Sequence, residues 1–89
     1  MEKTDLLKKY HDIVIEKLKN IMTDSVKYAE LVEVLKQVKR NFEDKNDLSQ
    51  SKDTLYRLYN LELLIEIKKY LWNDLFLEFL KDVKLDFNN

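Results

Sequence analysis

The residues that could carry out chemistry in this chain are few and poorly grouped. His11 is the only histidine, and its neighbour Asp12 does not share its helical face, so we expect an exposed or boundary histidine. Glu62 and Glu66 lie one helical turn apart, but paired carboxylates do acid–base work only in a cleft that perturbs their pKa values. We interpret them, with Lys69 beyond, as a solvated charged ridge.

The polar segment 44–48 has a weak similarity to a calcium-binding loop. It lacks the glycine of such a loop, and the twelfth position counted from Asp44 is Leu55, where a bidentate glutamate is required. The absence of cysteine excludes thiolate metal sites and cysteine nucleophiles, and the absence of glycine argues against a phosphate-binding loop. We therefore expect a protein that is not an enzyme and that holds no metal ion or cofactor.

Length, charge and hydropathy further limit the classes of protein to which this chain could belong. A chain of 89 residues forms one domain, and its net charge of -1 lacks the basic excess of a nucleic-acid binder. The first five residues lack the apolar stretch of a signal peptide. The most hydrophobic segment, residues 61–80, carries too many charged side chains to insert into a membrane. We expect a cytoplasmic protein with no nucleic-acid partner.

Apolar residues recur at three- and four-residue steps along most of the chain, which predicts an all-α protein. We expect helices over residues 5–22, 25–43, 52–72 and 74–83. The capping residues Asn73 and Asp74 favour a break between the last two, because one continuous helix would be about 48 Å long. Short connections imply antiparallel neighbours, so residues 1–89 are predicted to form one antiparallel four-helix bundle.

The predicted third helix carries two apolar stripes, although packing on one core needs only one. The broad stripe comprises Tyr56, Tyr59, Leu63, Leu64, Ile67, Tyr70 and Leu71. The narrow stripe comprises Leu58, Leu61, Ile65 and Trp72. Either the fourth helix or an oligomer mate covers the narrow stripe, or part of it is a recognition patch, since exposed apolar surface rimmed by charge marks interfaces.

The residues proposed for partner recognition lie in the C-terminal half. Trp72 and Leu77 are the predicted apolar anchors, and Arg57, Lys68 and Lys69 are the predicted steering charges. Interface energy concentrates in a few tryptophan, tyrosine and arginine residues, which makes Trp72 the strongest single candidate. The competing interpretation is that Trp72 closes the junction of helices three and four.

Two segments resemble a known family. The segment KYAELVEVLKQV (residues 27–38) resembles the second helix of the enterocin-A-type, pediocin-like (class IIa) bacteriocin immunity proteins. The polar loop that follows, and LYRLYN (residues 55–60) opening an aromatic-rich third helix, are similar to the same family. The resemblance covers roughly residues 6–83. Family members commonly carry proline before helix three, and many extend well beyond helix four; this chain has no proline.

The resemblance implies a cytosolic antiparallel four-helix bundle that protects a cell from a pediocin-like bacteriocin. Such toxins open pores through the membrane part of the mannose phosphotransferase permease, and the immunity protein acts from inside on the toxin–permease complex. In this family the C-terminal half of the immunity protein decides which toxin is resisted. We expect this permease with bound bacteriocin as partner, and a monomer or weak homodimer. The alternative is another small helical inhibitor that binds a protein, such as an antitoxin or a phage-encoded inhibitor.

Overall fold

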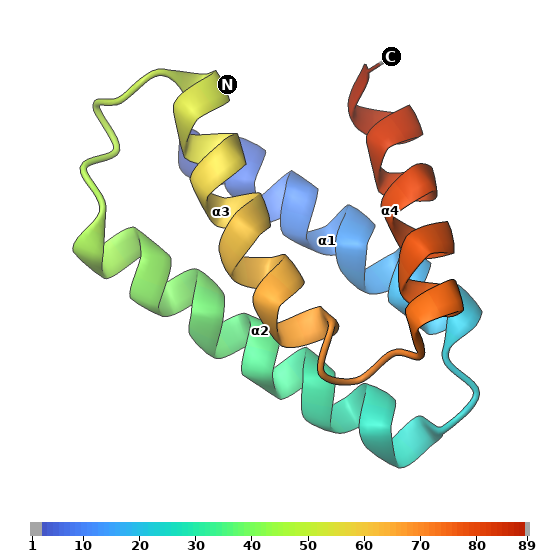
Figure 1. Cartoon of the computed structure of the whole chain (residues 1–89). Helices are drawn as coiled ribbons and strands as arrows, with labels where there is room; N and C mark the ends of the chain where they lie inside the picture. Colours follow the sequence, from blue (N-terminus) through green and yellow to red (C-terminus); the bar gives the residue numbers. More distant parts are fainter. Residues whose placement is uncertain (1–2, 89) are drawn as a thin grey trace.

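Four α-helices and no strand make up residues 3–88 in the computed structural model, which describes side chains over residues 5–83. The all-α prediction is therefore confirmed. The helices are α1 (Lys3–Ile21), α2 (Ser25–Lys45), α3 (Lys52–Ile67) and α4 (Asn73–Asn88) (Figure 1). Within residues 3–88, no helix combines the length and apolar character that a bilayer crossing requires.

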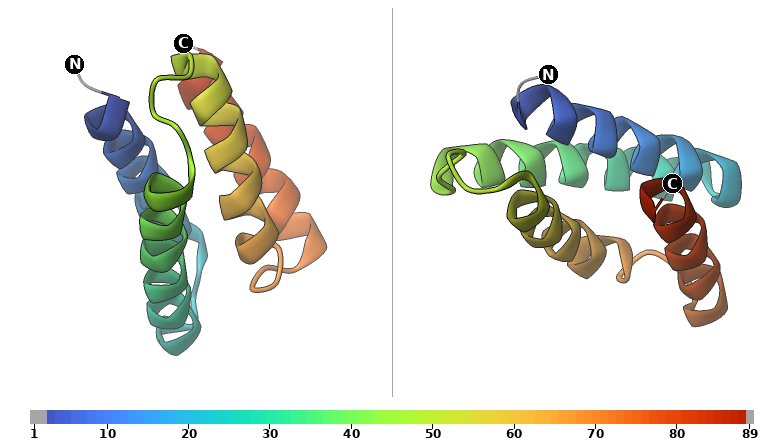
Figure 2. Two further views of the ribbon diagram at one scale, coloured as in Figure 1. Left: turned by 90° about the vertical axis from the view of Figure 1, so that its left-hand side faces the viewer. Right: turned by 90° about the horizontal axis from the view of Figure 1, so that it is seen from above.

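The helices pack in two layers, with α1 and α2 in one layer and α3 and α4 in the other (Figure 2). Consecutive helices run in opposite directions (Figure 1). Helix α2 packs most closely on α3, and α1 contacts each of the other three helices. This packing is compatible with the predicted four-helix bundle, with α1 as its most central member.

The core lies between the two layers and takes side chains from all four helices. Periodic spacing on each helix delivers them to one side, because residues three or four apart share a helical face. The buried apolar side chains are Leu7, Tyr10, Val14, Leu18, Leu31, Leu35, Phe42, Leu55, Tyr59, Leu63, Ile67, Phe79 and Val83. The predicted broad stripe of α3 thus supplies three of its residues, Tyr59, Leu63 and Ile67, to the core.

Capping residues start α2 and α3 where the sequence predicts breaks. The Asp24 carboxylate accepts hydrogen bonds from the backbone N–H groups of Val26 and Lys27, at 3.0 and 3.1 Å. The Ser51 hydroxyl accepts one from the N–H of Thr54 at 3.2 Å. Such bonds satisfy N–H groups that have no partner inside the helix.

Three helices have C-terminal ends that differ from the sequence prediction by two residues or more. Helix α2 runs to Lys45, beyond the predicted end at residue 43, and α4 runs to Asn88 instead of 83. Helix α3 ends at Ile67, before the predicted end at 72, because its bonds tighten to three-residue steps there. Lys69 N–H donates to Glu66 O and Tyr70 N–H to Ile67 O, at 3.1 and 3.0 Å.

Candidate recognition surface

The outward side of α3 is apolar. Leu58, Leu61 and Ile65 are 38%, 58% and 60% exposed, and we call these three residues the outer stripe. Their steps of three and four residues place them on one side of the helix. The buried residues of α3, which are Leu55, Tyr59, Leu63 and Ile67, occupy the other side. In residues 5–83, α4 therefore leaves the outer stripe uncovered.

Trp72 and Leu77 are also exposed. Trp72 is 85% exposed and lies in the connection between α3 and α4, where its carbonyl accepts a hydrogen bond from Phe76 N–H at 2.8 Å. Trp72 therefore lies after the end of α3, and the prediction that placed it within the third helix is wrong. Its indole does not close the junction between the two helices, because most of its surface stays accessible. Leu77 lies on α4 and is 50% exposed.

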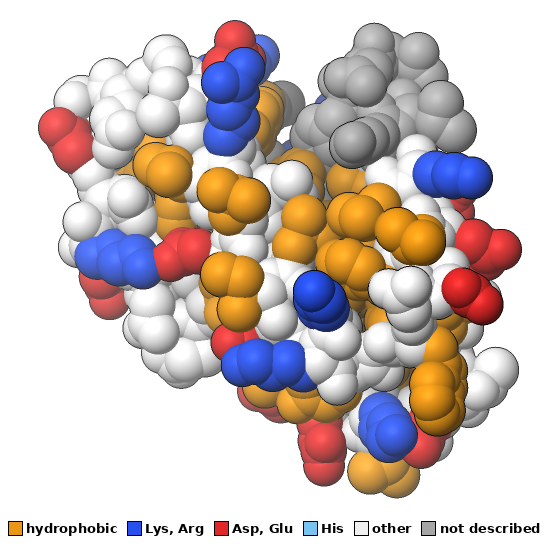
Figure 3. Space-filling model, viewed as in Figure 1, with side chains coloured by type: hydrophobic (Ala, Val, Ile, Leu, Met, Phe, Trp, Pro, Cys, Tyr) orange, Lys and Arg blue, Asp and Glu red, His pale blue; other side chains and the backbone are white. Residues whose placement is uncertain are grey.

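Charged side chains border this apolar surface. Arg57 and Lys68 are exposed, whereas the Lys69 ammonium lies 3.3 Å from the Glu66 carboxylate. Figure 3 shows hydrophobic side chains over α3 and between α3 and α4, with Lys and Arg side chains among them. The five predicted recognition residues are thus all solvent-accessible and all lie in the stretch from α3 to α4.

The two glutamates of α3 are partly buried and ion-paired, whereas the sequence predicts a fully solvated charged ridge. The Glu62 and Glu66 side chains are only 29% and 28% exposed. Glu62 forms an ion pair with Lys45 of α2, and Glu66 pairs with Lys69. These pairs neutralise both carboxylates, and the Lys45–Glu62 pair also ties α2 to α3.

His11 is buried, which contradicts the expectation of an exposed or boundary histidine. It is 7% exposed, and its Nδ1 lies 2.6 Å from the Tyr59 Oη. The signal that could have placed it is the spacing of Leu7, His11, Val14 and Leu18, which share the core face of α1. The imidazole is tolerated there because Tyr59, on another helix, supplies its hydrogen-bond partner.

Burial sets the protonation state of this polar pair. Desolvation lowers the pKa of His11, Asp12 opposes this shift, and Lys39 and Lys36 add to it. Burial also raises the pKa of Tyr59. Both groups are therefore neutral at pH 7 and closed off from solvent, so the pair joins two helices and offers no accessible acid or base.

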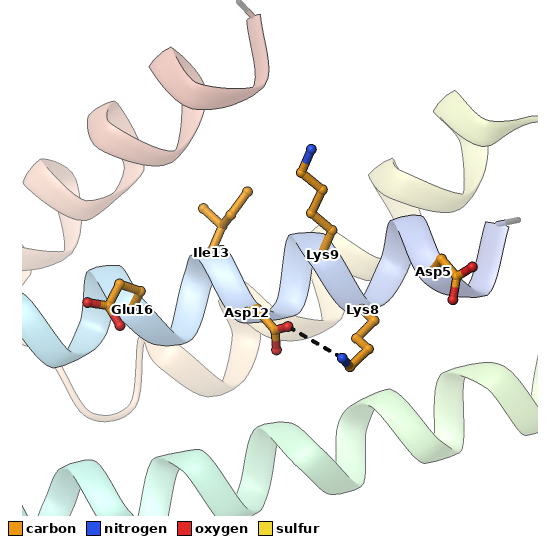
Figure 4. A pocket seen from close by; sticks show the side chains of 6 residues that line it. All are labelled: Asp5, Lys8, Lys9, Asp12, Ile13 and Glu16. Atoms are coloured by element: carbon orange, nitrogen blue, oxygen red, sulfur yellow. Dashed lines mark ion pairs between the residues drawn. The ribbon is translucent and has the colours of Figure 1, made fainter. Parts of the chain in front are cut away.

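An open hollow of about 410 Å³ lies on the outer side of α1 (Figure 4). One helix supplies all of its lining, which consists of Asp5, Lys8, Lys9, Asp12, Ile13 and Glu16. Two of these side chains already interact, since Lys8 Nζ lies 4.0 Å from Asp12 Oδ2. A hollow with walls from a single helix does not enclose a ligand.

Metal-ligating side chains do not gather in the described part of the chain. Residues 5–83 hold no group of three or more histidine, aspartate or glutamate side chains that could bind a metal ion. The feature that stands out is therefore the exposed apolar surface of the C-terminal half. No protein-family model, curated protein or solved structure matches this chain.

Proposed function

We propose that this chain is a bacteriocin immunity protein. It protects the cell from a pediocin-like bacteriocin by binding the toxin–permease complex from the cytoplasmic side. The observation that supports the proposal is that Trp72 is 85% exposed. Leu77, on the helix α4 that follows it, is half exposed. A tryptophan left in water is costly unless a partner covers it, and tryptophan is among the residues most enriched at interface hot spots.

The two apolar anchors suit recognition because they are not needed by the core. Trp72 stands in a connection between helices and Leu77 faces away from the buried Phe79 side of α4. Insertion of both into a partner buries apolar surface without disturbing α3 or α4. Arg57, Lys68 and Lys69 then steer the approach toward acidic groups of the complex. Lys69 contributes least, since Glu66 already neutralises it.

One acidic residue of the C-terminal half is available to bind a basic partner. Cytoplasmic loops of membrane proteins are rich in lysine and arginine, so acidic residues of this chain are natural partners for them. Glu62 and Glu66 are already engaged in ion pairs, whereas Glu78 is exposed on α4 next to Leu77. Glu78 is therefore the acidic residue that best fits a basic cytoplasmic loop.

The proposal is tested by expressing the full chain in a bacteriocin-sensitive strain and scoring survival against a panel of pediocin-like toxins. The double variant Trp72→Ala, Leu77→Ser should lose protection, while its helicity and thermal midpoint stay close to those of the parent. Val26→Ser is the matched control, because Val26 is 67% exposed but lies at the start of α2. This control should protect as well as the parent.

One result would contradict the proposed function, and another would contradict only the proposed recognition surface. Absence of protection against every toxin, with normal expression, would favour the alternative of another small helical inhibitor that binds a different protein. Full protection by the folded double variant would keep the immunity function but move the recognition surface away from Trp72 and Leu77. In that case the N-terminal helices are the next surface to mutate.

A further inference from the structure

The outer stripe of α3 has a shape that suits a deformable partner. Leu58, Leu61 and Ile65 all belong to one helix and point away from the core, so together they form a convex ridge. A protein partner gains most of its binding energy where side chains enter a pocket. A bilayer interface needs no pocket, because headgroups and acyl chains rearrange around apolar side chains that project from a surface.

The charges around the stripe are predominantly basic. Arg57 and Lys68 lie four residues before Leu61 and three residues after Ile65, so both share the face of the stripe. The acidic neighbours are neutralised, since Glu62 pairs with Lys45 and Glu66 with Lys69. With these two ion pairs cancelled, Arg57 and Lys68 give the residues around the stripe a charge of +2, although the whole chain carries -1.

The combination of residue types is the one found where proteins meet membranes. Leucine and isoleucine enter the boundary between headgroups and acyl chains, and flanking lysine and arginine bind anionic headgroups. The exposed Trp72 follows α3 along the chain, and tryptophan rings favour the same interfacial depth. No helix in residues 3–88 can cross a bilayer, so α3 would lie on the surface.

We propose that the outer face of α3, formed by Leu58, Leu61, Ile65, Arg57 and Lys68, docks on an anionic bilayer surface. This contact goes beyond recognition of a toxin–permease complex and does not depend on it. Docking would hold the protein against the membrane and confine its search for a partner to two dimensions. Binding is expected to be reversible, since few side chains contribute to it. It is also expected to weaken as salt is added, because salt screens the attraction between the basic side chains and the anionic headgroups.

The test uses the purified full chain and two kinds of vesicle, in a co-sedimentation experiment at low and high salt. One kind contains phosphatidylcholine mixed with phosphatidylglycerol, and the other contains phosphatidylcholine alone. The chain should sediment with the anionic vesicles at low salt and be released at high salt. The double variant Leu61→Ser, Ile65→Ser should bind about tenfold more weakly, because two apolar side chains no longer enter the interface.

A charge-matched pair of variants separates position from net charge. Arg57→Gln with Lys68→Gln should also lose about tenfold in affinity for anionic vesicles. Lys19→Gln with Arg40→Gln changes the net charge equally, but these exposed residues lie on α1 and α2. That control should bind as the parent does. Circular dichroism and the thermal midpoint confirm that each variant is folded.

Several outcomes would overturn the proposal. Equal sedimentation with both kinds of vesicle would remove the anionic headgroups as the partner and leave a contact that does not depend on lipid charge. Sedimentation with neither kind would leave a protein partner for the stripe. Equal weakening by both charge pairs would reduce the effect to net charge. If the unmodified chain is a dimer in solution and the double variant Leu61→Ser, Ile65→Ser is a monomer, the stripe binds a second copy of the chain. The vesicles contain neither toxin nor permease, so failure here leaves the immunity proposal untouched.

Discussion

His11 and Tyr59 join α1 to α3 through a contact of 2.6 Å between the imidazole Nδ1 and the phenol oxygen. The next residue along α3 makes a parallel contact, because the Tyr10 hydroxyl donates to the Asn60 side-chain oxygen. Two consecutive residues of α1 thus bind two consecutive residues of α3. Hydrogen bonds have stricter geometry than apolar contacts, so these pairs set how α1 lies against α3.

The burial of His11 predicts that stability decreases as the pH falls. The folded-state pKa of His11 lies below its ordinary value of about 6.5, so the unfolded chain takes up the proton first. Stability from this group is complete above that value and is lost as the pH decreases toward the folded-state pKa. Desolvation outweighs the attraction of Asp12 and Glu43, while Lys36 and Lys39 reinforce the shift.

Urea unfolding between about pH 7 and pH 5 measures this effect, in a range above most carboxylate titrations. His11→Gln is the matched variant, because glutamine keeps a polar side chain but does not titrate. The free energy of unfolding of the parent should fall over this range, and that of His11→Gln should stay nearly level. The same slope in both proteins would show that His11 is not the group responsible.

Removal of the Tyr59 hydroxyl should destabilise the fold. Tyr59→Phe keeps the ring, which contacts Phe42 with centroids 5.1 Å apart, but leaves His11 Nδ1 buried without a partner. We expect a loss of about 1–3 kcal/mol, the usual cost of an unsatisfied buried polar group. Tyr70→Phe serves as the control, because Tyr70 is only half-buried. A similar loss in both variants would mean that the hydrogen bond to His11 contributes little.

The two leucines at 61 and 63 provide an internal comparison of the faces of α3. Leu63 is fully buried, so Leu63→Ala should cost about 2–5 kcal/mol in the free energy of unfolding. Leu35→Ala on α2 should cost the same for the same reason. Leu61 is 58% exposed, and Leu61→Ala should stay within about 0.5 kcal/mol of the parent. Chemical denaturation in urea gives all three values, and comparable losses at 61 and 63 would mean that both faces are packed.

The Asp24 cap should contribute measurably to α2. Asp24→Ala removes the acceptor for the N–H groups of Val26 and Lys27, and we expect a loss of about 0.5–2 kcal/mol. Asp24→Asn keeps a side-chain oxygen at the same place and should lose much less. Thermal and urea unfolding compare the two, and an unchanged midpoint in Asp24→Ala would show that water replaces the cap without cost.

Local sequence signals were sufficient for the helices and most of their starts. Ser51 and Asp24 cap helices where the sequence predicts breaks, because capping involves only residues a few positions apart. The end of α3 was predicted too late. Apolar residues continue past Ile67 through Tyr70 and Leu71, so periodicity alone carries no sign that the bonding pattern tightens there.

The sequence by itself determined the fold class, the four helices and which stripe of α3 enters the core. These follow from the spacing of apolar residues, which acts within each helix. Tertiary packing alone decided two matters. It buried His11, which is acceptable only because Tyr59, far along the chain, lies opposite it. It also left Leu61 and Trp72 exposed, since whether a second apolar stripe is covered depends on where α4 packs, and α4 lies against α1.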